Sequence, residues 1–120
     1  MASKKLVQDF YKSDAVINST VMEKFLHPDF ELEWHSTKGL VKMNRHQLLK
    51  FADDLGTAYI RSKVKIKHIL KEGNFVTVQY KHSIKTIENP REEIPLAYFF
   101  TIWEIKDDKL FRGYQMSQLV

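Results

Sequence analysis

The stretch VKIKHILKEGNFVTVQYKHSI, residues 64–84, alternates between apolar and polar side chains on both sides of a short polar segment. Successive side chains of a β-strand point to opposite faces, so this period of two predicts two strands that each bury one face. The segment between them, Glu72-Gly73-Asn74, is rich in residues that tolerate positive φ. The stretch therefore predicts a β-hairpin.

The hydrophobic pattern also predicts the register of this hairpin. If Leu70 faces Val76 and Ile66 faces Tyr80, the apolar side chains of both strands lie on one face. A slip by one residue would place Leu70 against Thr77 and mix the two faces. The first register is therefore the expected one.

Two histidines fall on the apolar faces of these strands. In the predicted register His68 faces Val78 and His82 faces Val64, which separates the two imidazoles by roughly 13 Å at ordinary strand rise. They cannot share a metal ion, and no HExxH-type spacing occurs, so the sequence predicts neither a metal site nor a cofactor. Each histidine is either a buried residue bonded to a neighbour or a group that acts on a ligand. His68 is the candidate for a catalytic role.

A second hairpin follows near the end of the chain. Residues 96–103 are apolar on both faces, as expected of a central strand that is covered twice. Asp107-Asp108 connects this strand to a last one that spans residues 110–119. A two-residue turn would place Thr101 opposite Tyr114 and would place Phe99 opposite Met116.

The inward faces of the predicted strands and the first helix gather large aromatic side chains. They line an apolar pocket with a few polar groups, or they simply fill the core. The residues expected to face this interior are Phe10, Trp34, Tyr59, His68, Tyr80, Phe99, Thr101, Trp103, Tyr114 and Met116.

The opposite face of the second hairpin is apolar as well. Three helices cannot cover both faces of a single sheet, so this face predicts a symmetric homodimer. The residues expected in the dimer interface are Tyr98, Phe100, Ile102 and Phe111.

Helical spacing and capping residues occur in the first half of the chain. A first helix is expected from Ser3, and a second over residues 20–26 after the capping box that Thr20 begins. A third begins at Asn44, which forms a weaker box with Gln47, and Gly56 is expected to end it.

The segment HPDFELEWHS, residues 27–36, reads as a short strand that follows the second helix. Its apolar face carries Phe30, Leu32 and Trp34, and its polar face carries Glu31, Glu33 and His35. The apolar face is expected to point inward, which leaves both acids in solvent rather than in a pocket.

Length and composition favour one domain over residues 1–120, expected in the cytoplasm. The chain has no cysteine and no apolar run of the ~18 to 20 residues that a membrane span needs. Its net charge is +4, and the lysines at 63, 65, 67 and 71 form a row without stacking aromatic residues. Such a row is typical of a solvated strand face, so nucleic-acid binding is not favoured.

The order of these elements resembles the nuclear transport factor 2-like superfamily, and most of all its SnoaL-like branch. The resemblance implies an α+β fold, in which a cone-shaped, strongly curved mixed or antiparallel sheet wraps around three N-terminal helices. It also implies a pocket and, commonly, a dimer. The supporting stretches are residues 10–14, 26–29, 68–74 and 102–110.

Ketosteroid isomerase, a member of this superfamily, places two acidic groups and a tyrosine in its pocket. The resemblance implies a catalytic carboxylate near the end of the first strand, an acidic hydrogen-bond donor on the third long strand and a tyrosine on helix one. The corresponding positions here carry Trp34, Thr101 and Phe10. Tyr11 lies one residue from the tyrosine position, but an indole cannot replace the base.

Three functions remain open at this stage. The first is the binding of a small apolar ligand without the isomerase carboxylates. The second is an isomerase-, cyclase- or dehydratase-like enzyme that uses a pocket histidine or tyrosine. The third is a protein-interaction module that captures a partner through its sheet or lysine face.

Overall fold

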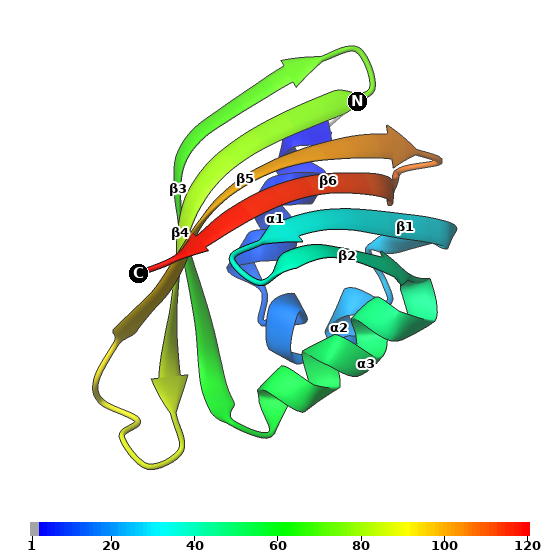
Figure 1. The fold of residues 1–120 in the computed structure, drawn as a ribbon. Helices are drawn as coiled ribbons and strands as arrows, with labels where there is room; N and C mark the ends of the chain where they lie inside the picture. The colour runs from blue at the N-terminus through cyan, green and yellow to red at the C-terminus, as the bar shows by residue number, and fades with distance from the viewer. Residues whose placement is uncertain (1–2) are drawn as a thin grey trace.

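The computed structural model describes residues 3–120, and its sheet bends around the helices that lie on its concave side (Figure 1). The sheet order is β2-β1-β6-β5-β4-β3, with β1 and β6 parallel and the other neighbours antiparallel. The predicted α+β fold with a curved mixed sheet is confirmed. Within residues 3–120 the elements are α1 (Ser3–Lys12), the 3-10 helix η1 (Ala15–Ile17), α2 (Ser19–Met22), β1 (Leu26–Ser36), β2 (Gly39–Asn44), α3 (Arg45–Gly56), β3 (Tyr59–Glu72), β4 (Phe75–Thr86), β5 (Ile94–Lys106) and β6 (Lys109–Leu119).

Helix α3 begins with the capping box that its sequence predicts. The Asn44 side chain accepts a hydrogen bond from the Gln47 backbone N–H, and the Gln47 side chain accepts one from the Asn44 backbone N–H. The helix ends at Gly56, as predicted, and Thr57 is the C-cap. A Cβ atom on Gly56 would lie 2.5 Å from the carbonyl oxygen of Ile17, so this glycine permits close packing of α3 against η1.

The second helix is shorter and begins earlier than predicted. Asn18, not Thr20, caps it, because the Asn18 side chain accepts a hydrogen bond from the Val21 backbone N–H. The helix ends at Met22, and Leu26, expected in the helix, is the first residue of β1. The helices of residues 3–120 are all too short or too polar to cross a bilayer.

Strand β2 was not predicted from the sequence. It forms a hairpin with β1 at the edge of the sheet, and five of its six residues are exposed. Its alternation is too short to identify a strand from the sequence, since only Val41 and Met43 turn toward the cavity. The predicted faces of β1 are correct, since Phe30 and Leu32 are buried and Glu31 is exposed.

The β3–β4 register agrees with the prediction from Arg61 to Ile66 and not beyond. Ile66 faces Tyr80 as expected, but a β-bulge after Ile66 brings His68 opposite Gln79. Beyond the bulge Leu70 faces Thr77 and is exposed, which is the pairing that hydrophobic patterning rejected. The prediction that His68 and Leu70 face inward is therefore wrong, because the extra residue reverses the faces. Ile69 packs against the core instead.

A second bulge changes the β5–β6 register. The turn does consist of Asp107 and Asp108, both at positive φ, as expected for a two-residue hairpin loop. The bulge between Glu104 and Ile105 then shifts all later pairs by one residue. The structure corrects the prediction by pairing Thr101 with Gln115 and Phe99 with Ser117, which turns Tyr114 and Met116 to the outer face.

Trp103 lies at the centre of the core beneath the concave face of the sheet. Its side chain is 3% exposed, and its Nε1–H donates a hydrogen bond of 3.0 Å to the Tyr11 hydroxyl. Gly113 faces the indole from β6, and a Cβ atom there would lie 2.9 Å from the ring. A glycine at this position therefore lets the indole pack closely against β6.

Candidate functional site

A cavity of about 440 Å³ lies between the concave face of the sheet and the helices. Its volume falls within the range of about 300–1,000 Å³ that is typical of small-molecule sites. Buried lining residues such as Phe10 and Leu32 close one end. At the other end the lining residues Lys38 and Leu119 are exposed, so the cavity opens between the β1–β2 turn and the end of β6.

Aromatic rings form much of the cavity wall. Tyr80 and Phe99 stack with nearly parallel rings 4.9 Å apart, and Trp34 tilts against Phe99 with centroids 6.1 Å apart. Phe51 of α3 contacts the other side of Trp34 edge-on, at 5.6 Å. This wall suits a flat apolar ligand, because offset stacking and edge contacts with aromatic rings are both favourable.

Most polar groups near the wall are paired with one another. The Trp34 Nε1–H donates to the Ser117 hydroxyl at 2.8 Å, and the Thr101 hydroxyl donates to the Gln115 side-chain oxygen at 2.9 Å. Thr101 is fully buried and does not line the cavity itself. These bonds satisfy groups that would be costly to bury alone.

Two buried tyrosines that line the cavity keep their protons. Burial raises the pKa of Tyr11 to about 12, even though hydrogen bonds from Tyr80 and Trp103 act in the opposite direction. Burial and the neighbouring Tyr11 raise the pKa of Tyr80 well above its ordinary value. Both side chains are therefore neutral phenols near pH 7, able to donate hydrogen bonds but not to act as bases.

His82 is the histidine that the sheet places on the cavity wall. Its Nε2 lies 2.8 Å from the Ser62 hydroxyl, and its side chain is almost wholly buried. Burial lowers the pKa of His82 to about 4. The imidazole is consequently uncharged at neutral pH.

Comparison with known proteins places this geometry in a fold family. No protein-family model matches the chain, and no curated protein sequence matches it. Among solved structures, AusH from Aspergillus nidulans superposes with a TM-score of 0.79 at 9% identity, covering 96% of this chain and 82% of AusH. The chain has the nuclear transport factor 2-like fold.

Two further structures with this fold carry a described role. IdmH from Streptomyces antibioticus, a putative polyketide cyclase, has a TM-score of 0.73 at 13% identity over 98% of this chain and 92% of IdmH. A putative SnoaL-like polyketide cyclase from Shewanella denitrificans has a TM-score of 0.72 at 11% identity, over 96% of this chain and 89% of that protein. At these identities the likeness shows the nuclear transport factor 2-like fold alone.

Half of the pocket residues expected from the sequence line the cavity of this nuclear transport factor 2-like fold. Strand parity places these correctly wherever the pairing is regular. The residues that line it are Phe10, Trp34, Tyr80, Phe99 and Trp103.

The other expected pocket residues lie elsewhere. The bulges turn His68, Tyr114 and Met116 to the outer face, and Tyr59 is half-buried outside the cavity lining. His68 therefore has no access to a ligand in the cavity. Sequence reasoning missed Gln115 and Ser117, which the shifted β6 register brings inward in place of Tyr114 and Met116.

The cavity holds no acidic side chain of the described chain. Glu31 and Glu33 lie on the outer face of β1, opposite the inward Leu32. The ionised residue among the lining side chains is Lys38, at the opening. Residues 3–120 also contain no cluster of three histidine or acidic side chains that could hold a metal ion.

Proposed function

We propose that this protein binds a small, largely apolar molecule in the cavity. The observation that carries the proposal is the cavity itself, about 440 Å³ in volume, walled by aromatic rings and lined by no carboxylate. Burial of a flat apolar ligand there removes apolar surface from water on both partners. A buried ammonium group would find no counterion in the cavity, which favours a neutral ligand.

The proteins that share this fold support a role at this level. IdmH and the Shewanella protein are described as putative polyketide cyclases. An enzyme that uses a pocket histidine or tyrosine is the second candidate function, and His82 is the residue that favours it. A base with a pKa near 4 accepts protons poorly at neutral pH, so binding has the stronger support.

Binding can be tested with N-phenyl-1-naphthylamine, a neutral aromatic probe whose fluorescence rises in apolar surroundings. The protein is expected to bind it saturably, and the probe is expected to raise the melting temperature by mass action. Replacing Ala97, a small cavity-lining residue, with tryptophan should abolish saturable binding because the indole fills the space. Probe titration and thermal unfolding measure both effects.

The matched control is Tyr98→Trp, which adds an indole on the same strand but on the outer face. It should leave the probe affinity unchanged. If Ala97→Trp does not fold, Ala97→Leu provides a smaller obstruction with the same expected direction. Saturable binding of equal strength by the wild type and a folded Ala97 variant would contradict the proposal, as would no binding by the wild type.

We also propose that the outer face of the sheet forms a homodimer. Tyr98, Phe100 and Ile102 project from β5, and the register sets Phe100 beside Met116 of β6. Phe100 is 58% exposed and Met116 is 60% exposed, although both are large and apolar. Phe111, also expected in the interface, lies at the end of this face beneath the Arg112 guanidinium.

A second copy is the proposed occupant of this patch, because a two-fold interface sets an apolar patch against itself. Glu31 and Glu33 flank it on β1, whereas Lys63 and Lys65 flank it on β3, at the far side of the sheet. A two-fold axis parallel to the strands would lay the apolar centre of one copy on that of the other, and the β1 side of one copy over the β3 side of the other.

The dimer can be tested by sedimentation or light scattering. The wild type is expected at twice the 14.2 kDa chain mass, and Phe100→Glu is expected to yield the monomer because it buries a charge at the interface centre. Ile87→Glu, at an equally exposed isoleucine in the β4–β5 loop, should leave the mass unchanged. A monomeric wild type, or a dimer that Phe100→Glu leaves intact, would refute this interface.

A further inference from the structure

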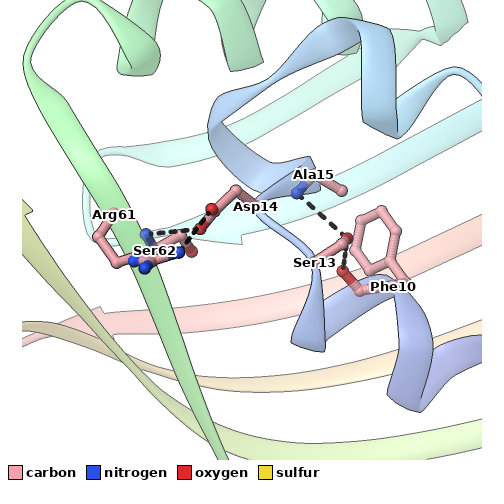
Figure 2. A network of polar contacts seen from close by, with 6 residues as sticks. All are labelled: Phe10, Ser13, Asp14, Ala15, Arg61 and Ser62. Atoms are coloured by element: carbon pink, nitrogen blue, oxygen red, sulfur yellow. Dashed lines mark hydrogen bonds and ion pairs between the residues drawn. The ribbon is translucent and has the colours of Figure 1, made fainter.

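A chain of hydrogen bonds leads from the end of α1 to the cavity wall. Figure 2 shows Asp14, just after α1, facing β3, where one carboxylate oxygen accepts from the Ser62 backbone N–H at 3.2 Å. The other carboxylate oxygen pairs with the Arg61 guanidinium at 3.2 Å. The neighbouring Ser13 hydroxyl donates to the Phe10 carbonyl and accepts from the Ala15 N–H, which holds this corner in shape. Ser62 is thereby held in a defined position.

Ser62 in turn orients the imidazole of His82. Its hydroxyl lies 2.8 Å from Nε2, and both side chains are buried. If Nε2 carried the proton, the Ser62 hydroxyl proton would have no acceptor in the interior. If the hydroxyl donates to Nε2, that proton is satisfied, and the imidazole proton sits on Nδ1. We therefore assign the tautomer with the proton on Nδ1. It pairs the Ser62 hydroxyl and leaves the Nδ1–H available to a group in the cavity.

The remaining N–H of His82 belongs to the cavity. Within residues 3–120 no protein group accepts a hydrogen bond from Nδ1, while His82 lines the cavity. The residue opposite it on β5 is Ala97, whose small side chain leaves room for a ligand. Gln115 and Ser117 also line the cavity, but they are half-buried, so water can satisfy their free groups. His82 is only 4% exposed, so its free N–H finds an acceptor in the cavity.

We propose that His82 determines the specificity of the cavity, by donating its Nδ1–H to a carbonyl oxygen of an otherwise apolar ligand. The proposal rests on the ligand-binding function proposed above and adds the chemical class of the ligand, a ketone or similar hydrogen-bond acceptor. Ser62 is a positioning residue in this arrangement, and Asp14 holds Ser62 through its backbone. The hydrogen bond to Ser62 fixes the orientation of the His82 imidazole. The Nδ1–H therefore points in one direction and selects a ligand that has an acceptor there.

The test uses 1-tetralone and tetralin, two bicyclic probes that differ in one carbonyl group. Calorimetry is expected to show that the wild type binds tetralone roughly two- to tenfold more tightly, the usual worth of one hydrogen bond. His82→Phe should bring the ratio of the two affinities to about one while the affinity for tetralin is retained. His68→Phe, on the outer face, should leave the ratio at its wild-type value.

Two further measurements distinguish recognition of the carbonyl by His82 from a purely structural role of this residue. The ¹⁵N chemical shift of His82 Nδ1 should change with tetralone and not with tetralin, a readout that needs no variant. Ser62→Ala should lower the affinity ratio, and Ser62→Thr, which restores the hydroxyl, should recover it. If tetralin binds but His82→Phe leaves the ratio of the two affinities unchanged, the His82 assignment is overturned. It is also overturned if the Nδ1 chemical shift does not change with tetralone. Neither result would overturn the proposed binding function. Failure of both probes to bind would overturn the proposed function as well.

Discussion

Replacing Trp103 with alanine is expected to lower the free energy of unfolding by about 3–5 kcal/mol, the cost of removing a large buried aromatic side chain. The indole is 3% exposed and packs against Phe10 and Phe30, with ring centroids 5.6 and 6.1 Å away. The neighbouring Gly113 cannot fill the space that the indole leaves. Urea unfolding followed by circular dichroism measures the change.

Tyr11→Phe is the matched control for this prediction. It removes the hydroxyl that accepts the Trp103 Nε1–H but keeps both rings in the core. The expected loss is about 1–3 kcal/mol, the cost of one buried donor left without a partner. If Trp103→Ala cost no more than Tyr11→Phe, the indole would not be the packing centre described above.

Acidification from pH 6.5 to pH 4 is expected to remove about 3 kcal/mol of stability through His82 alone. Burial lowers the pKa of His82 in the folded protein to about 4, whereas its unperturbed value is 6.5. Above pH 6.5 neither state binds the proton, so this residue makes no contribution to the pH dependence. Below pH 6.5 His82 is protonated in the unfolded chain but not in the folded chain. The free energy of unfolding therefore falls by about 1.4 kcal/mol per pH unit until the pH reaches the pKa of His82 in the folded protein.

The measurement compares urea unfolding of the wild type and of His82→Gln at a series of pH values. The variant retains a polar side chain but cannot titrate, so the difference between the two curves isolates His82 from the carboxylates. That difference should grow as the pH falls from 6.5 to about 4 and then level off. Parallel curves over this interval would mean that His82 is protonated as easily in the folded state as in the unfolded one.

The sequence predicts which side chains face the cavity where the strands pair regularly, and it fails beyond the β-bulges. Tyr80, Phe99 and Trp34 lie in regularly paired parts of their strands, where parity alone places them on the cavity wall. His68 lies just beyond the bulge in β3, and Met116 lies beyond the one between β5 and β6, and both face outward. One inserted residue reverses every later face, so each error has the same physical origin.

The sequence could not reveal these bulges because it is apolar on both faces where they occur. Ile69 and Leu70 are adjacent and equally suited to burial, so patterning cannot choose between them. The outward-facing apolar residues of β6, such as Met116, are just as ambiguous. The choice depends on how far the sheet must curve around the helices, which is a property of the assembled sheet.

By itself, the sequence of this protein determined the hairpin turns, the cap of α3, the inward side of β1 and the order of the long strands. These features depend on local backbone preferences and on the period of the side chains. Only the tertiary structure decided which histidine reaches the cavity, because Asp14, Ser62 and His82 meet across 48 and 20 residues of chain. Such contacts arise from sheet curvature and strand register, which adjacent residues do not encode.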